Sequence, residues 1–398
     1  MSALKQGIYI VAAKRTPFGA FGGKLKDKTA AELGGIAAKA ALATLPAELP
    51  IDSVIIGNVM QTDRSGAYLA RHIGHRANLP VNVPALTVNR LCGSGFQSVI
   101  NAAHEIIAGE SKIVLTGGAE SMSLSPYTIH GSTRWGTKYG VDLKAEDSLA
   151  AALVDQYPTP TPMGITAENL GERNTISRQE CDEYALQSQK RWAAAHEAGR
   201  FKEEIVPIEL KVRKGTEIME ADEHPRPQTT IENLAKLPPV FKKDGVVTAG
   251  NASGICDGAA AVVVASEEAV KQHGLKPLAR VVGWHVAAVE PTIMGIGPVP
   301  AIREALKRAG LSLKDMGLVE VNEAFAAQYL AVEKELGLDR AITNTNGGAI
   351  ALGHPLGASG SRILTHLTYE MRRLNKEFVV GSACIGGGQG IAVILQQV

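Results

Sequence analysis

The sequence has few aromatic residues, few cysteines and almost no net charge. Phenylalanine, tryptophan and tyrosine make up 5% of the 398 residues, and the formal net charge is +1. A chain without an excess of lysine and arginine lacks the basic face that nucleic-acid binding requires. The four cysteines are too few and too scattered for a disulfide scaffold: Cys92, Cys181, Cys256 and Cys384. These absences favour a globular protein with an aliphatic core, in which a special cysteine is either reactive or simply buried.

Long hydrophobic runs are also missing. No stretch approaches the ~20 uninterrupted apolar residues that a membrane span needs. The N-terminus shows no apolar signal-peptide core either. Before the first acidic residue, Asp27, the chain carries basic charges only, at Lys5, Lys14, Arg15, Lys24 and Lys26. This basic start is compatible with import into mitochondria, although the same residues also suit a structural or ligand-facing role.

What the sequence does contain is an alternation of strand-like and helical segments that occurs twice. Strands are expected at 8–12, 53–59, 112–116 and 278–282, and helices at 29–43, 94–108, 300–308 and 361–371. The segment that ends at Asn58 is echoed by the one that ends at Asn322, and the apolar strand at 113–116 by the one at 378–381. This nearly constant offset indicates a duplicated βα unit. The order of elements predicts an α/β fold, with helices on both faces of the sheet.

Between the two copies the chain has a different character. Residues 120–243 contain two Pro-rich runs and a long helical pattern at 177–198, which begins with the capping box of Ser177 and Glu180. An insertion of this length with its own helices is typical of a substrate-binding lid. The expected division is therefore 1–119 with 244–270, then 120–243, then 271–398.

Cys92 stands in a Gly-rich turn between a strand-like segment and a helix. Near a helix N-terminus, the unpaired N–H groups and the positive end of the dipole favour thiolate over thiol. Gly93 and Gly95 allow a sharp turn and leave room for a substrate beside the sulfur. The pattern indicates a nucleophile. The alternative is a buried cysteine that packs as a small apolar residue.

Two further polar residues lie where they can act on a substrate. His354 follows Gly353 in a loop of small residues, and a neutral imidazole there can take a proton from a thiol or polarise a carbonyl. Its alternative is a loop histidine bound to a backbone carbonyl. Asn322 ends a strand and precedes a helix, where its amide can orient a water or donate to an oxyanion. An N-cap is the alternative role for Asn322.

Cys384 precedes a run of three glycines, 386–388, directly after an apolar strand. Their backbone N–H groups can form an oxyanion hole or an anion nest. The Lys-Ser/Thr pair of a phosphate-binding P-loop is missing. Cys181 and Cys256 are expected to be structural. No metal site is expected, since only His72 and His75 show a paired ligand spacing.

Taken together, four motifs make the whole chain resemble the thiolase superfamily. They are Cys-Gly-Ser-Gly at 92–95, Asn-Glu-Ala-Phe-Ala at 322–326, Gly-His-Pro-x-Gly-x-Ser-Gly at 353–360 and Cys-x-Gly-Gly-Gly-x-Gly at 384–390. The resemblance implies the thiolase fold, in which two duplicated βαβαβ-type halves form α-β-α-β-α layers and carry an inserted loop domain. Within the superfamily the chain looks most like the degradative mitochondrial enzymes, through residues 11–19, 238–243 and 294–300.

The resemblance also implies a ping-pong reaction on 3-ketoacyl-CoA. Cys92 attacks the 3-keto carbon while His354 accepts its proton, and Cys384 protonates the departing acetyl-CoA enolate. Cys384 then deprotonates a second coenzyme A, which removes the acyl group from Cys92. One oxyanion hole combines His354 with a water on Asn322, and the other uses the backbone N–H groups of Cys92 and Gly386. Such donors contribute about 3–4 kcal/mol each in comparable sites.

Coenzyme A is expected as a substrate, with no permanently bound cofactor. By match to the family, Arg226 and Thr229 meet its nucleotide end. Ser253 and Ala249 lie along the pantetheine, with Met163 beside it, and Phe325 walls the thiol end. A surface loop is the alternative reading of the proline-flanked Arg226. The family further implies a homotetramer built as a dimer of dimers, in the mitochondrial matrix, or in the cytoplasm if the source is bacterial.

Two positions depart from the family pattern. Acetoacetyl-CoA-specific members carry His-Met where Pro162-Met163 stands here, which favours a degradative enzyme of broader acyl length. Cys256 replaces the polar residue usual before Asp257-Gly258, without a functional account. The alternatives are an acetoacetyl-CoA thiolase that works toward condensation and a catalytically inactive acyl-CoA- or lipid-binding protein. Ketoacyl-carrier-protein synthases are a further alternative. They usually pair Cys with two histidines, and Cys384 stands in the place of one of these histidines, which argues against this class.

Overall fold

In the part of the chain that the structure describes, a mixed sheet of ten strands forms the framework. The computed structural model describes residues 6–213 and 215–398, so Lys5 of the basic N-terminal segment lies outside the described residues. The strands of the sheet are β1 (Ile8–Arg15), β2 (Gly19–Ala20), β3 (Ser53–Gly57), β4 (Ala85–Val88), β5 (Ile113–Ser121), β12 (Cys256–Ser266), β13 (Ala279–Ala288), β14 (Met316–Val321), β15 (Phe378–Ile385) and β16 (Gln389–Gln396). Their order is β14-β15-β16-β13-β1-β12-β5-β3-β4, with β2 paired to β12.

The sheet consists of two similar halves that join where β1 meets β13. In one half β5 pairs in parallel with β3 and antiparallel with β12, and in the other β15 pairs in parallel with β14 and antiparallel with β16. In the first half β3 also pairs in parallel with β4. In the second half β14 has a corresponding parallel bridge, between Val319 and Thr343. The duplication predicted from the sequence offset is therefore confirmed by the strand pairing.

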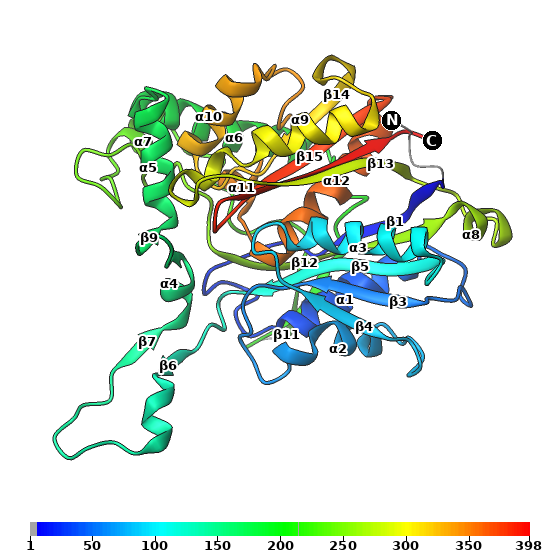
Figure 1. The fold of residues 1–398 in the computed structure, drawn as a ribbon, viewed down its shortest axis with the longest axis horizontal. Helices are drawn as coiled ribbons and strands as arrows, with labels where there is room; N and C mark the ends of the chain where they lie inside the picture. Colours follow the sequence, from blue (N-terminus) through cyan, green and yellow to red (C-terminus); the bar gives the residue numbers. More distant parts are fainter. Residues whose placement is uncertain (1–5, 214) are drawn as a thin grey trace.

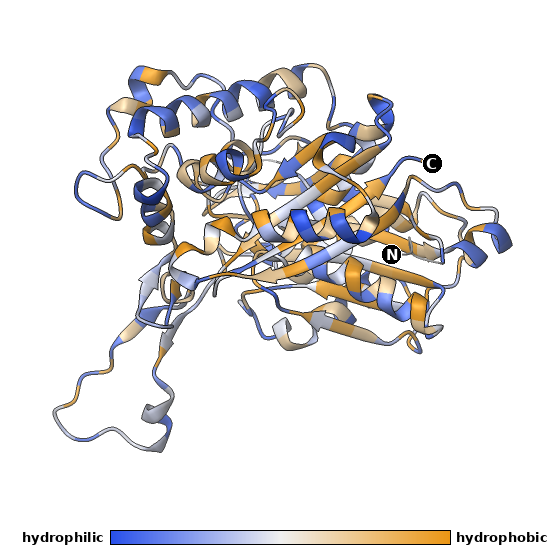
Figure 2. Ribbon diagram, turned by 45° about the horizontal axis from the view of Figure 1, so that its top comes forward, coloured by the Kyte–Doolittle hydropathy of each residue, from blue (hydrophilic) through white to orange (hydrophobic). Residues whose placement is uncertain are grey.

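Helices cover the strands on both sides and also lie between the two halves. Those of the duplicated core are α1 (Ala30–Leu42), α2 (Leu69–Arg76), α3 (Ser94–Ala108), α8 (Glu267–Gln272), α9 (Pro298–Ala309), α10 (Ala326–Leu336), α11 (Ala349–Leu352) and α12 (Ser359–Arg373), with the 3₁₀ turns η1 (Gly66–Tyr68), η3 (Pro291–Ile296), η4 (Leu313–Asp315) and η5 (Leu356–Ala358). Figure 2 shows apolar residues concentrated on the central strands and polar residues on the outward faces of helices. The predicted helix at 94–108 has these bounds, and the one at 300–308 begins two residues earlier, at Pro298.

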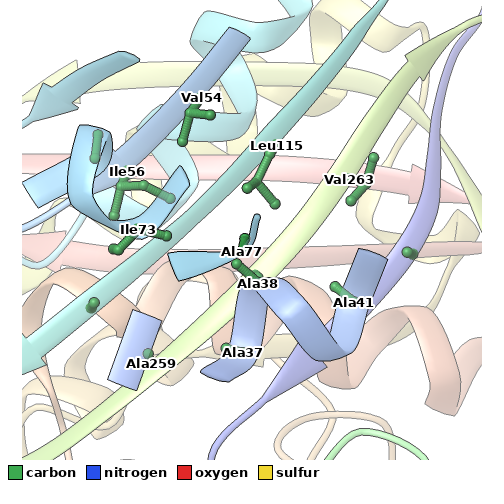
Figure 3. Packing of buried hydrophobic residues seen from close by; sticks show 14 of the residues in the cluster. Ala37, Ala38, Ala41, Val54, Ile56, Ile73, Ala77, Leu115, Ala259 and Val263 are labelled. Atoms are coloured by element: carbon green, nitrogen blue, oxygen red, sulfur yellow. The ribbon is translucent and has the colours of Figure 1, made fainter. Parts of the chain in front are cut away.

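Three large apolar clusters account for the layers. One outer cluster packs α1 and α2 against strands of the N-terminal half, for example Ala38 and Ile73 against Val54 and Leu115 (Figure 3). The central cluster joins α3 and α12 to both halves of the sheet, and the third covers the C-terminal half. Alanine dominates α1, which lets the helix lie close to the sheet and explains how so few aromatic residues suffice. The expected layering of helices and sheet halves is confirmed.

The insertion after β5 contains small sheets and helices of its own. Its elements are β6 (Tyr127–Ile129), η2 (Gly131–Trp135), β7 (Ala145–Asp147), α4 (Ser148–Ala152), β8 (Val154–Asp155), β9 (Thr161–Pro162), α5 (Met163–Arg173), α6 (Arg178–Glu197), β10 (Ile208–Val212), β11 (Gly215–Met219) and α7 (Ile231–Ala235). Helix α6 begins at the predicted capping box of Ser177 and Glu180. Figure 1 shows β6 and β7 at the base of an arm that projects from the rest of the molecule.

Candidate active site

The turn that carries Cys92 is held in an unusual backbone conformation. Leu91 has a φ of 46°, in the left-handed region that non-glycine residues rarely adopt. Gly93 is the N-cap of α3, and a Cβ on Gly93 would lie 2.5 Å from Ile385 Cδ1. The glycine therefore lets this turn approach the strand that carries Cys384. The expected position of Cys92 just before a helix is confirmed.

The backbone N–H groups of Gly386 and of Cys92 itself act to lower the pKa of the Cys92 thiol. Burial nevertheless raises the pKa of Cys92 to about 11, because these two hydrogen bonds offset it only in part and the nearby Glu120 adds to the rise. The resting group is thus the thiol. The thiolate expected from the helix end alone is wrong, since desolvation outweighs the helix terminus at this position.

His354 is held so that one ring nitrogen remains available. It is buried, and burial together with the Arg362 guanidinium lowers its pKa to about 3, so the imidazole is neutral. Its Nδ1 lies 2.5 Å from Ser359 Oγ, and that hydroxyl donates to Pro355 O at 2.9 Å. Since the serine proton is directed at Pro355, Nδ1 is the donor and Nε2 keeps its lone pair. Such a neutral imidazole can act as a base.

Asn322 Nδ2 lies 3.4 Å from His354 Nε2, a long hydrogen bond in which the amide donates to the lone pair of the ring. Its backbone N–H donates to Ser382 O, which fixes the end of β14 against β15. Its Oδ1 is buried and receives no hydrogen bond from the described residues. The side chain is 1% exposed, so this acceptor faces the interior of the protein.

Cys384 lies close to Cys92 at the end of β15. It is buried, and burial raises its pKa, with a smaller contribution from the neighbouring Cys92. It packs with Met294, Ala324, Met163 and Phe325. Cys92 instead packs beside Met122, Leu149 and Leu356. Apolar groups thus surround both sulfurs, and each cysteine is a neutral thiol at rest.

A cavity of about 380 Å³ opens onto the reacting groups. Its lining includes Cys92 and His354, and three of the residues expected to hold coenzyme A: Met163, Ser253 and Phe325. The other three are not in this lining: Arg226 and Ala249 are exposed and Thr229 is half-buried. The structure thus brings the catalytic candidates together with half of the expected coenzyme A contacts.

Two side chains that the sequence reasoning missed contribute to this site. Ser359 lies five residues after His354 inside the same motif, a spacing that could have pointed to it. Glu120 is fully buried at the end of β5 and accepts hydrogen bonds from the loops around the pocket. Its only sequence signal is a carboxylate at the end of an apolar strand.

The other two cysteines pack as expected. Cys181 and Cys256 are buried in apolar clusters. Across residues 6–213 and 215–398, no group of three or more His, Cys, Asp or Glu side chains is arranged to hold a metal ion. Within the same ranges, no helix has both the length and the apolarity needed to cross a bilayer.

Comparison with known proteins covers the chain almost from end to end. The sequence model of the thiolase N-terminal domain matches residues 8–268, and that of the thiolase C-terminal domain matches residues 275–397. The chain is 62% identical to the human mitochondrial 3-ketoacyl-CoA thiolase over 99% of both sequences. It is 48% identical to an acetyl-CoA acetyltransferase of Pseudomonas aeruginosa, over 98% of the chain and 99% of that protein.

Solved structures agree with these sequence matches. The crystal structure of the human mitochondrial 3-ketoacyl-CoA thiolase superimposes with a TM-score of 0.97 at 62% identity, and 99% of each chain is covered. A structure of the human enzyme in complex with CoA gives the same TM-score at 61% identity, and the match covers 100% of this chain and 99% of that one.

Proposed function

This chain belongs to the thiolase family, and we propose that it cleaves 3-ketoacyl-CoA with coenzyme A to give acetyl-CoA and a shortened acyl-CoA. The reaction would belong to fatty acid β-oxidation. The observation that carries the proposal is that Cys92 and a neutral His354 line the same cavity, while the backbone N–H groups of Cys92 and Gly386 act on the Cys92 sulfur. A nucleophile, a base and oxyanion donors are what covalent acyl transfer requires.

In the first half-reaction the Cys92 thiol attacks the 3-keto carbon while its proton moves to His354 Nε2. The negative charge that develops on the keto oxygen is stabilised by the N–H groups of Cys92 and Gly386. The carbon–carbon bond then breaks, which leaves an acyl group on Cys92 and the enolate of acetyl-CoA. The high pKa of Cys92 makes the base necessary, because few thiolates form without it.

The enolate is held and then protonated by the opposite side of the site. His354, now protonated at Nε2, donates to the enolate oxygen together with a water held by Asn322, whose buried Oδ1 is free to accept from that water. Cys384 gives its proton to the enolate carbon, and acetyl-CoA leaves. Cys384 then takes the proton of an incoming coenzyme A thiol, whose sulfur attacks the acyl group. Cys92 leaves as a thiolate and takes its proton back from His354.

Coenzyme A is the substrate that both halves of the reaction share. Met163, Ser253 and Phe325 line the cavity and would contact the pantetheine and its thiol end. Ala249, Arg226 and Thr229 would lie farther out, with Arg226 and Thr229 at the nucleotide. The backbone N–H of Arg226 donates to Gln189 Oε1 at 2.8 Å, which anchors that loop to α6 and leaves the guanidinium exposed.

The main alternative is an acetoacetyl-CoA thiolase that works toward condensation. Proteins named acetyl-CoA acetyltransferase are also similar to this chain, at 48% identity. The presence of Pro162 in place of histidine favours the degradative reaction. Relative kcat/KM for acetoacetyl-CoA and a C8 ketoacyl-CoA separates the two. A preference of about 100-fold or more for the short substrate, roughly 3 kcal/mol, would reject the degradative assignment. Loss of catalysis is disfavoured because all four motifs are present.

The direct test is to capture the acyl-enzyme. Mass spectrometry after addition of a 3-ketoacyl-CoA should find an acyl adduct on the peptide that contains Cys92. Cys92→Ala should abolish the adduct and the thiolytic activity, whereas Cys181→Ala, at a buried cysteine of α6, should keep both. An adduct retained in Cys92→Ala would refute the nucleophile assignment.

Further properties of the chain are proposed on the same basis. We infer a homotetramer arranged as a dimer of dimers. The exposed apolar side chains of the projecting arm, residues 127–147, support this assembly. We place the protein in the mitochondrial matrix, since its relatives include enzymes named as mitochondrial, with the cytoplasm as the alternative for a bacterial source. The chain divides into 1–119 with 244–270, then 120–243, then 271–398.

A further inference from the structure

The carboxylate of Glu120 joins two loops at the Cys92 side of the cavity. Its Oε1 accepts from Asn58 Nδ2 at 3.0 Å and from the backbone N–H of Met60 at 2.9 Å. Its Oε2 accepts from the backbone N–H groups of Val59 at 3.1 Å and Gly357 at 2.7 Å. One buried side chain thus connects the segment after β3 to η5, which begins two residues after His354.

The connection depends on a close approach of the two loops. A Cβ on Gly357 would lie 2.9 Å from Glu120 Oε2 and 2.9 Å from Asn58 Cα. A Cβ on Gly118, in β5, would lie 1.9 Å from Gly357 O. No larger residue fits at either position, so the loop that carries His354 rests directly on the end of β5. Glu120 holds it there through Gly357, while the backbone N–H of His354 donates to Gly254 O at 2.9 Å.

The bound carboxylate has no compensating positive charge among these contacts. Its four donors are neutral amides, and a charged neighbour that acts on it is another carboxylate, Asp257 of β12. Burial raises the pKa of Glu120 to about 7, against the hydrogen bonds from Met60, Gly357 and Val59, and Asp257 adds to the rise. The charge of Glu120 also contributes to the raised pKa of the Cys92 thiol.

We propose that Glu120 is a positioning residue for the thiolytic reaction: as a carboxylate it holds the His354 loop against the Cys92 pocket, and as a carboxylic acid it loosens it. The inference rests on the proposed function. A carboxylate accepts from all four donors, whereas the O–H of a protonated acid must face at least one N–H and loses that hydrogen bond. Burial moves the pKa of Cys92, His354 and Cys384 away from neutrality, so an acid limb near pH 7 does not come from these reacting groups.

The test compares kcat as a function of pH in the wild type and in Glu120→Gln. The wild type should lose kcat as the pH falls, with a midpoint near the Glu120 pKa of about 7. Glu120→Gln should lack this acid limb and lose about 10- to 100-fold in kcat, the cost of one or two unpaired buried N–H groups. Its KM should stay within about two-fold, because the substrate contacts are unchanged.

Asp52→Asn is the matched control. Asp52 Oδ2 accepts from the backbone N–H groups of Lys112 at 2.7 Å and Ile113 at 2.9 Å, just before β3 and at the start of β5, the end of this strand pair away from Glu120. The control should keep the wild-type kcat and pH profile. A Glu120→Gln variant that folds and has the wild-type kcat and pH profile would overturn the inference. If Glu120→Gln does not fold, a flat wild-type kcat between about pH 6 and 8 overturns it, and an acid limb supports it. A wild type without thiolytic activity refutes the proposed function instead.

Discussion

His354 is fixed by Ser359, whose Oγ lies 2.5 Å from the imidazole Nδ1. The serine hydroxyl donates in turn to Pro355 O at 2.9 Å, so it can only accept from the ring. This chain of hydrogen bonds selects the tautomer whose Nε2 is unprotonated. Because burial also lowers the pKa of His354 to about 3, the imidazole is unprotonated near neutral pH and can accept a proton.

Replacing Ser359 with alanine should therefore reduce turnover without weakening substrate binding. Loss of one buried hydrogen bond releases the ring orientation and the tautomer, and we expect kcat to fall about 10-fold, or ~1.4 kcal/mol, with KM unchanged. Steady-state kinetics with a 3-ketoacyl-CoA measures both parameters. Ser361→Ala is the control, since Ser361 is equally buried on α12 and donates to Gly95 O at 3.2 Å. Equal losses in the two variants would contradict a specific role for Ser359.

The sequence predicts most of the fold because its signals are local or repeated. The capping box at Ser177 and the near-constant offset between the copies predict α6 and the two halves of the sheet, and the structure has both. The four motifs also predict which loops meet. What sequence cannot show is burial: the pKa of Cys92 depends on how much solvent the folded protein removes. The sequence does not reveal the role of Glu120 either, because its hydrogen-bond partners come from loops that are distant in the chain.

Arg226 offers a test of the nucleotide end of the proposed coenzyme A site. Its backbone N–H already holds the loop through Gln189, so Arg226→Ala removes the exposed guanidinium and leaves that anchor in place. We expect KM for coenzyme A to rise about 3- to 10-fold with kcat unchanged, the loss of an exposed charge-assisted contact to phosphate. Pantetheine substrates lack the nucleotide and should be processed equally well by wild type and variant.

The control for Arg226 is Lys211→Ala, which removes an exposed cation from β10. It should leave the KM for coenzyme A unchanged. If Arg226→Ala also leaves that KM unchanged, or raises the KM for pantetheine as much as for coenzyme A, the guanidinium does not contact the nucleotide.

A buried ionic network connects the insertion to both halves of the core. Arg15, at the end of β1, binds Glu204 at 2.7 Å and Asp222 at 2.7 Å. The other oxygen of Glu204 lies 2.8 Å from Nδ1 of His366 on α12. Against burial, His366 and Arg15 lower the pKa of Glu204 to about 2, and the pKa of His366 is raised despite burial, chiefly by Glu204. Removing one member leaves the others buried without their partner.

Glu204→Gln should lower the free energy of unfolding at pH 7 by about 3–5 kcal/mol. A carboxyl with a depressed folded pKa stabilises the protein above its unfolded value of 4.5, and this contribution is lost as the pH falls toward 2. The deficit of the variant should thus shrink below about pH 4.5. Urea denaturation at a fixed protein concentration measures it. Glu203→Gln, at the exposed neighbour, should change stability by less than about 0.5 kcal/mol. If Glu204→Gln and Glu203→Gln had the same free energy of unfolding, the ionic network would make no net contribution to stability.

The projecting arm, residues 127–147, exposes more apolar surface than a free segment should. Trp135 is 84% exposed and Tyr139 is 107% exposed, and Tyr127, Ile129, Val141 and Leu143 are exposed as well. Clustered exposed apolar side chains mark interaction sites. Figure 1 shows the arm extending away from the layers. The arm therefore supports the proposed assembly of two dimers.

Trp135→Glu combined with Tyr139→Glu should divide the proposed tetramer into dimers, because charged side chains cannot be buried unpaired in an apolar contact. Light scattering coupled to gel filtration should give twice the molecular mass for the wild type as for the double variant. Ile218→Glu, which places the same charge at an exposed apolar residue of β11, should keep the wild-type mass. A double variant with the wild-type mass would show that the arm does not hold the two dimers together. A wild type that is already a dimer would refute the tetramer, because the arm would then have no second pair of subunits to hold.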